Sequence, residues 1–234
     1  MELTMDQYII DYEFLYKNGS RKNFRLALDP NTVTLLNFGQ SERPSWARLT
    51  YTQCICCPLL ESDQPYCPIA VNISELVEHF KEMVSYEVCE VRCIKPERTY
   101  LKETSIQTGL YSILGIVMAT SNCPVMDFYK PLARFHLPFS TLEETIFRMA
   151  ASYLLKQYFE YKNGQKPDLD MRHMIDTLKK VEQVNAGILK RIKRIAVEDA
   201  QNNALIVLNS FCQMFTMEIE ESLISIEYLF NSKN

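Results

Sequence analysis

The N-terminal segment alternates apolar and mostly polar positions, which is the two-residue period of a strand with one buried face. The period holds over residues 8–16 and resumes over residues 24–28. A two-residue turn between them would place the two apolar sets on opposite faces of the sheet. A three-residue loop that ends at Gly19, with this glycine in the left-handed conformation, aligns them instead. The pattern therefore predicts a hairpin in which Tyr12 faces Phe24.

Further strands and two helices follow from the same reading of the pattern. We expect a third strand at 33–38 and a fourth along the alternating apolar positions 47–51, and another strand at 86–94. Between the last two, Asn72 is expected to cap a helix. Apolar residues at helical spacing over 106–118 predict a central, buried helix.

The C-terminal part of the chain has the three- and four-residue period of helices. Ser140 and Glu143 are spaced as a capping box that would open one helix, and Asn163-Gly164 would end it. No proline follows Pro167, and apolar residues beyond it form a seam close to a heptad repeat. Either one very long helix or an antiparallel helical hairpin that turns near 198–203 fits this seam.

Composition and charge exclude several classes of protein. The net charge of −4 argues against binding of nucleic acid or anionic lipid through the charge of the whole protein. The six glycines form no P-loop or dinucleotide-binding turn, and the three histidines do not have the spacing of a zinc protease. The longest apolar run falls well short of the roughly 20 residues that a membrane helix needs. The first twenty residues show no secretory signal, so we expect a soluble, cytoplasmic protein.

The cysteines are the best candidates for a chemical site. In a reducing compartment, the eight cysteines are expected to be thiols or metal ligands rather than disulfides. Cys54 and Cys57 have the C-x-x-C spacing that lets two sulfurs reach one ion, and Cys67 and Cys123 each precede a proline, as Cys57 does. These four residues predict a tetrahedral zinc site that ties the β-region to the end of the central helix.

Alternatives to this ligand set remain open. An iron–sulfur cluster would use the same thiolates, and reduced cysteines would instead pack as small apolar residues. Cys56 could replace Cys54 or Cys57 as a ligand, and His136 could replace a cysteine.

Other cysteines have a structural or a reactive interpretation. Cys89 and Cys93 share one strand face and are expected in the core, as is Cys212 on the helical seam. If no metal binds, Cys123 could be a nucleophile, with its pKa lowered by a helix N-terminus and with His136 as its base.

Polar residues in the C-terminal region admit two interpretations. The basic cluster at 190–194 is expected to be a solvated helix face rather than a nucleic-acid contact, because no aromatic residues are interleaved with it. Asn185, Asp199 and Asn202 occupy seam positions, where a buried polar residue can fix the register and number of partners. The other interpretation is that they face a polar pocket for a ligand.

Four short motifs resemble those of an uncharacterised bacterial protein family of unknown function. They are the Cys-x-x-Cys-Pro at 54–58, the Cys-Pro pairs at 67–68 and 123–124, and the Arg-Phe-His-Leu-Pro-Phe at 134–139. The resemblance implies a bacterial, soluble protein and brings no activity, cofactor or partner with it.

Together these observations predict an α+β protein with an N-terminal antiparallel β-sheet, a cysteine-rich, metal-closed connection, a central buried helix and a C-terminal bundle of long helices. We expect an α+β domain at 1–138 and a helical region at 139–234. The leading hypothesis is a non-enzymatic regulatory or interaction protein that forms a homodimer through its C-terminal helices, with a protein partner as a further possibility and no membrane contact. The alternative is a redox or thiol-dependent enzyme that uses an iron–sulfur or cysteine-rich site.

Overall fold

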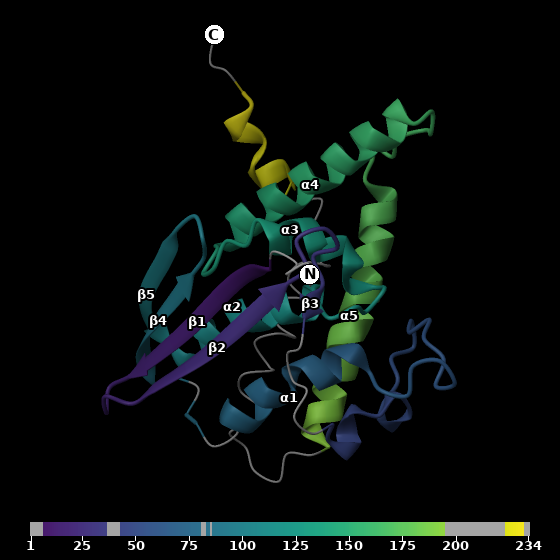
Figure 1. Cartoon of the computed structure of the whole chain (residues 1–234). Helices are drawn as coiled ribbons and strands as arrows, with labels where there is room; N and C mark the ends of the chain where they lie inside the picture. Colours follow the sequence, from purple (N-terminus) through teal and green to yellow (C-terminus); the bar gives the residue numbers. More distant parts are fainter. Residues whose placement is uncertain (1–6, 37–42, 81–82, 85, 195–222, 232–234) are drawn as a thin grey trace, which may run out of the picture.

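The computed structural model describes residues 7–36, 43–80, 83–84, 86–194 and 223–231 (Figure 1). In this part of the chain, the strands form one antiparallel sheet in the order β3-β2-β1-β4-β5. The strands are β1 (Tyr8–Tyr16), β2 (Arg21–Leu28), β3 (Leu35–Leu36), β4 (Val88–Ile94) and β5 (Thr99–Ser105). The helices are α1 (Pro68–Phe80), α2 (Ile106–Ala119), α3 (Lys130–Arg134), α4 (Leu142–Lys162) and α5 (Arg172–Lys193). The mixed α and β composition expected from the sequence is confirmed.

The first hairpin has the predicted register. Tyr12 pairs with Phe24, and the loop that joins the strands ends at Gly19, whose φ of +82° is left-handed. The alternate residues of β1 that face the helices are buried. The apolar alternation and the glycine therefore determine the register together, as the sequence indicated.

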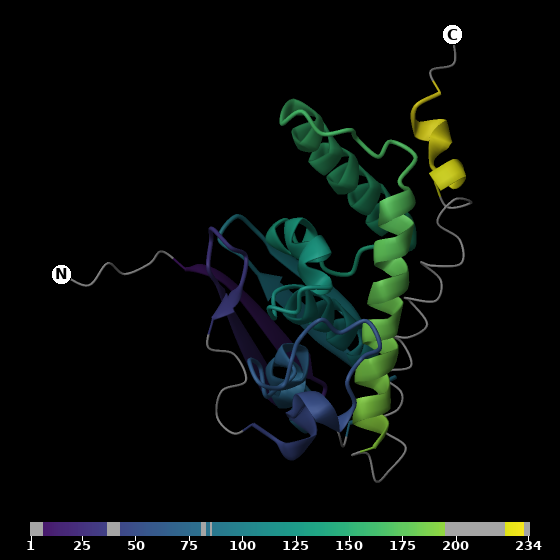
Figure 2. The same cartoon turned by 90° about the vertical axis from the view of Figure 1, so that its right-hand side faces the viewer.

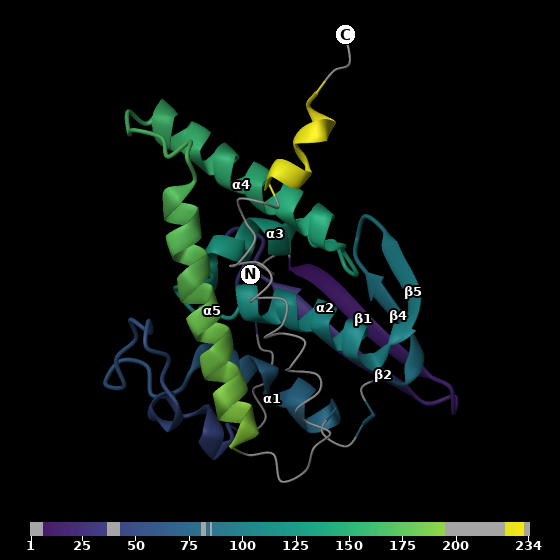
Figure 3. The ribbon, with the colours of Figure 1, turned by 180° about the vertical axis from the view of Figure 1, so that it is seen from behind.

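Helices cover one face of this sheet in a second layer. Seen from behind, α1 and α2 lie across the sheet (Figure 3), and α5 runs alongside them (Figure 2). The central helix is confirmed, because nearly all its apolar residues are buried. At Gly109, a Cβ atom would lie 2.6 Å from Phe14 Cε1 and 2.8 Å from Val91 Cγ2, both on the sheet. This glycine lets α2 approach β1 and β4 closely.

Two of the predicted strands differ from the structure. The fourth strand is wrong: residues 47–51 belong to two short 3₁₀ helices, Ser45–Ala47 and Leu49–Tyr51, except for Arg48, which forms an isolated antiparallel bridge with Tyr66. Ala47 and Leu49 are buried as the alternation suggested, and backbone hydrogen bonds join them to the segment before α1: the Leu49 N–H donates to the Pro65 carbonyl and the Cys67 N–H to the Ala47 carbonyl. The third strand is shorter than expected, because Val33 has a left-handed φ of +53° and the strand starts only at Leu35. The rest of its predicted range lies outside the described residues.

The starts of α1 and α4 also differ from the predicted ones. Asn72 does not cap α1, because the helix begins four residues earlier at Pro68, a residue suited to the first helical turn. The capping box of α4 is formed by Thr141 and Glu144, one residue later than the predicted pair of Ser140 and Glu143. The predicted end of α4 at Asn163 is confirmed.

Strand β5 was missed by sequence analysis altogether. It pairs with β4 along its full length at the edge of the sheet. Most of its residues are exposed or half-buried, so it lacks the apolar alternation that marks the other strands. Its end passes directly into α2, where the Ser105 side chain accepts a hydrogen bond from the backbone N–H of Thr108.

Two apolar clusters form the core of the described residues. The larger one contains the inner face of the sheet, α1, α2 and the C-terminal half of α5, from Val181 to Ile192. The smaller one joins α4 to the start of α5 through Met149, Tyr153, Met174 and Leu178. The larger cluster draws on residues from both 1–138 and 139–234, and the division into these two domains stays a prediction.

The seam residues of α5 are buried as predicted, up to Ile192. Its continuation, the hairpin turn near 198–203 and the seam residues Asp199, Asn202 and Cys212 lie outside the described residues. None of the described helices has both the length and the apolar character that crossing a membrane requires.

Candidate functional site

The four cysteines predicted as ligands lie at the ends of different elements. Cys54 and Cys57 follow the 3₁₀ helices, Cys67 immediately precedes α1, and Cys123 follows α2. Burial, together with the neighbouring thiols of Cys67, Cys56, Cys57 and Cys123, raises the pKa of the Cys54 thiol to about 12. The folded chain therefore brings all four predicted residues within electrostatic range of one another.

Cys67 and Cys123 share a local geometry that favours an anionic sulfur. Each precedes a proline and a helical turn, and backbone N–H groups of that turn point at the sulfur. Burial raises the pKa of both thiols, to about 11 for Cys123, while the N–H groups oppose this rise. They come from Ile69 and Ala70 for Cys67 and from Val125 and Met126 for Cys123. Backbone N–H groups in such turns stabilise negative charge.

The backbone of α5 closes one side of this cysteine cluster, which we define as Cys54, Cys56, Cys57, Cys67 and Cys123. The Sγ atom of Cys54 lies 3.9 Å from the Val184 carbonyl oxygen, and that of Cys56 lies 3.3 Å from the Lys180 carbonyl oxygen. At Gly187, a Cβ atom would lie only 2.5 Å from Cys54 Sγ. The glycine in the middle of α5 therefore makes room for this thiol.

Arg191 is the largest of the fully buried side chains in the described part of the chain, with 1% of its surface exposed. Its guanidinium donates hydrogen bonds to the carbonyl oxygens of Trp46, of Arg48 at 2.6 Å, of Leu49 at 3.3 Å and of Thr52 at 2.9 Å. It thereby fixes the irregular segment that leads to Cys54. The prediction that the whole basic cluster is solvated is wrong for this residue.

The charge of Arg191 is coupled to the cysteines. Burial lowers the pKa of its guanidinium, and negative charge on Cys67 and Cys54 opposes this change. Its Nε–H group is buried and has no hydrogen-bond partner among the described residues. Sequence analysis missed Arg191, although its position three residues after Ile188 places it on the buried face of the helix.

The thiols are gathered but not arranged as ligands. Within the described ranges, no three histidine, cysteine or acidic side chains are placed so that they could hold a metal ion. The zinc set and its iron–sulfur alternative stay predictions.

The alternative of a nucleophilic Cys123 is wrong, because burial raises the pKa of this thiol instead of lowering it. His136 is buried, and its Nε2 atom shares a 2.5 Å hydrogen bond with the Tyr12 hydroxyl. Cys89 and Cys93 are confirmed as core residues.

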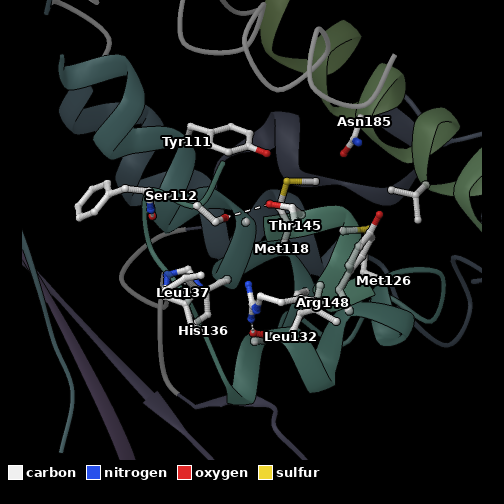
Figure 4. A pocket seen from close by; sticks show the side chains of 18 residues that line it. Tyr111, Ser112, Met118, Met126, Leu132, His136, Leu137, Thr145, Arg148 and Asn185 are labelled. Atoms are coloured by element: carbon white, nitrogen blue, oxygen red, sulfur yellow. Dashed lines mark hydrogen bonds between the residues drawn. The ribbon is translucent and has the colours of Figure 1, made fainter. Parts of the chain in front are cut away.

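A cavity of about 160 Å³ is the second candidate site (Figure 4). Side chains from α2, α3, α4 and α5 converge on it, and most of them are apolar. Its polar wall includes the hydroxyls of Ser140 and Thr145, which are 3.0 Å apart, and the guanidinium of Arg148. Asn185 also lines it, which agrees with the interpretation that this seam residue faces a pocket, although the pocket is mainly apolar.

A buried polar network stands behind one wall of the cavity. The Tyr12 hydroxyl lies 2.9 Å from the Ser112 hydroxyl as well as being bonded to His136. Burial, together with the cations of Lys95 and Arg148, lowers the pKa of His136 to about 3. His136 is therefore neutral near pH 7 and contributes no charge to the cavity.

Comparison with protein families places the chain in one of them. A family described as "Domain of unknown function (DUF6901)" matches residues 10–231, which is nearly the whole chain. The protein therefore belongs to this family, whose description names no activity. Comparisons with curated proteins and with solved structures gave no match.

Proposed function

We propose that this chain is a non-enzymatic regulatory or interaction protein, stabilised by a zinc ion that Cys54, Cys57, Cys67 and Cys123 bind. The observation that carries the proposal is that these four thiols, predicted from spacing alone, come from three separate regions of the chain and lie within electrostatic range of one another. All are at the ends of elements or in irregular segments, and a zinc site requires that they come together as a tetrahedron when the metal binds.

The surroundings of the cluster support a negatively charged metal centre. A zinc ion with four thiolates carries a net charge of −2, and buried charge is costly unless it is compensated. Arg191 supplies one buried positive charge, and the N–H groups at Cys67 and Cys123 supply partial positive charge. Groups of this kind beyond the ligands orient and tune metal sites.

The raised thiol pKa values favour a structural role over thiol chemistry. A reactive cysteine needs a thiolate near neutral pH, whereas burial raises the pKa of Cys54 to about 12 and that of Cys123 to about 11. A metal ion would displace these protons and couple folding to its binding.

The metal test uses the full chain purified without oxygen, followed by elemental analysis and a visible spectrum. We expect colourless protein with about one zinc ion per chain, as a single four-thiolate site requires. A Cys54→Ala, Cys57→Ala double variant should lose the zinc, while Cys89→Ala, which removes a buried thiol of β4 outside the cluster, should keep it. Zinc retained by the double variant, or metal-free wild-type protein, would refute the metal site. A coloured protein containing iron would favour the iron–sulfur alternative.

We propose further that two copies associate through their helical regions. On α4, Leu155, Tyr158, Phe159 and Tyr161 are each more than half exposed. Leu155, Tyr158 and Phe159 are spaced three and four residues apart, which puts them on one side of the helix. Contiguous apolar surface of this kind is typical of interaction sites, and a second copy of the same helix offers a matching surface.

Light scattering coupled to size-exclusion chromatography of the full chain tests this association. We expect a dimer for the wild type and a monomer for Phe159→Glu. Lys156→Gln changes the net charge by the same single unit on a neighbouring position of α4 and should leave the dimer intact. A wild-type monomer, or a Phe159→Glu dimer, would contradict the interface.

A further inference from the structure

The cavity between α2, α3, α4 and α5 has one charged wall. Among its lining residues that the structure describes, only Arg148 carries a charge at neutral pH, because His136 is neutral. The guanidinium of Arg148 lies beside His136 and Leu132 (Figure 4). Its Nη2 atom donates to the carbonyl oxygens of Leu132 at 3.1 Å and of Phe135 at 2.7 Å.

The positive charge of Arg148 is only partly compensated, because the Glu144 carboxylate acts on it through space and not by direct contact. No carboxylate in the described part of the chain forms an ion pair with it. The closest acidic residue on the same helix face, Glu144, instead accepts a hydrogen bond from the Thr141 backbone N–H in the capping box. A half-buried guanidinium has five N–H donors in a planar fork, and the two bonds from Nη2 leave Nη1 and Nε to bind a further acceptor.

The size of the cavity limits what could supply that acceptor. A cavity of 160 Å³ is close to the roughly 150 Å³ that accommodates a benzene molecule in another protein's apolar core. The walls opposite Arg148 include Met118, Met126 and Ile116, so the remaining surface is apolar. Shape and polarity therefore favour a molecule with one ring or a short chain and a single anionic end.

We propose that this cavity binds a small apolar carboxylate, with its apolar body against Met118 and Leu132 and its carboxylate on Arg148. Because both hydrogens of Nη2 are used by backbone carbonyls, Nη1 would supply the charge-assisted hydrogen bond to one carboxylate oxygen. The hydroxyls of Ser140 and Thr145 lie in the same wall; Thr145 donates to the Thr141 carbonyl oxygen and Ser140 to Thr145, so a carboxylate would accept from Ser140 only if that hydroxyl turned away from Thr145. The proposal is independent of the metal site, since none of the lining residues is a cysteine.

Gly115 offers a way to close the cavity without damaging the fold. It lines the cavity, and a Cβ atom added there would meet no described atom within 4 Å. A leucine at this position projects into open space, and replacement of glycine within a helix also favours the helical conformation. Gly115→Leu should therefore fold normally and occupy the space that the ligand needs.

The experiment is calorimetric titration of the full chain with sodium benzoate, sodium hexanoate and benzamide, the last being a neutral molecule of benzoate's shape. We expect saturable binding of at least one of the two carboxylates to a single site, about tenfold tighter or more than that of benzamide, as the loss of charge-assisted hydrogen bonds implies. Arg148→Met should weaken carboxylate binding by a similar factor, and Gly115→Leu should abolish it.

The control is Arg92→Met, which removes the same side chain from β4, where Arg92 contacts Glu90; it should leave the titration unchanged. Circular dichroism establishes that each variant is folded, and Gly115→Leu keeps the test decisive if Arg148→Met does not fold. The proposal is overturned if neither carboxylate binds, if benzamide binds equally well, or if binding survives in Gly115→Leu.

Discussion

Replacement of Arg191 by methionine tests how the irregular segment before the cysteine cluster is held. The side chain is fully buried and donates to four carbonyl oxygens, of which those of Arg48 and Thr52 are 2.6 and 2.9 Å away. Methionine keeps the length and apolar stem of the arginine side chain but donates nothing. Those carbonyl groups would then be buried without partners or would have to open to water.

The size of the effect follows from these bonds. A hydrogen bond to a charged group contributes about 1.5–3 kcal/mol, so four would give roughly 6–12 kcal/mol, as much as the whole stability of a typical domain at about 5–15 kcal/mol. Bonds that share one side chain are not additive. We therefore expect Arg191→Met to lower the free energy of unfolding by about 3–5 kcal/mol, the range found when one partner of a buried charged pair is removed.

Urea unfolding followed by far-ultraviolet circular dichroism measures this loss, and thermal unfolding should show a Tm lower by roughly 6–20 °C for a chain of this size. Arg194→Met is the matched control: Arg194 lies one turn away, is exposed and bonds Tyr51 and Thr52, and its loss should cost under about 1 kcal/mol. Equal stabilities for the two variants would refute the role assigned to Arg191.

Two further predictions concern the core. Gly109→Ala should be less stable than Gly115→Ala by about 1–3 kcal/mol. Both variants gain the same helix propensity, but only Gly109→Ala places a Cβ atom within 2.8 Å of Phe14 and Val91. Equal urea midpoints would contradict the close packing of α2 on the sheet. The pKa of His136 is about 3 in the folded chain, below its ordinary value of about 6.5. Between about pH 6.5 and pH 3 the unfolded chain therefore binds a proton at this residue that the folded chain does not bind. The free energy of unfolding falls on acidification for this reason. Between pH 7 and pH 5 this group alone should cost about 2 kcal/mol, and a His136→Gln variant that shows the same pH slope in urea unfolding would disprove the assignment.

The parts of the fold that sequence analysis predicted correctly are those where one physical constraint dominates. In the first hairpin, a single buried face and one left-handed glycine leave one register for Tyr12 and Phe24. The central helix is apolar on nearly all sides, so its burial follows from its composition. In both cases the local pattern and the tertiary environment agree.

The errors arose where burial and local conformation have different causes. Ala47 and Leu49 alternate as in a strand, yet their segment is irregular and its carbonyls are satisfied by Arg191, which local sequence does not reveal. Strand β5 lies at the sheet edge with mostly exposed residues, so it has no apolar signal. The four cysteines chosen from the sequence lie within electrostatic range of one another, but their role as ligands stays a prediction. Arg148 and the cavity depend on four helices whose contacts only the structure gives.

The hydrogen bonds donated by Arg191 join two segments that are translated at different times. Thr52 and Arg191 are 139 positions apart, and ribosomes add about 5–20 residues per second. The carbonyl groups near Thr52 are therefore translated roughly 7–28 s before Arg191, which binds them. During that interval the nascent polypeptide exposes a loop rich in cysteine, so its maturation depends on whatever keeps those thiols reduced until α5 emerges.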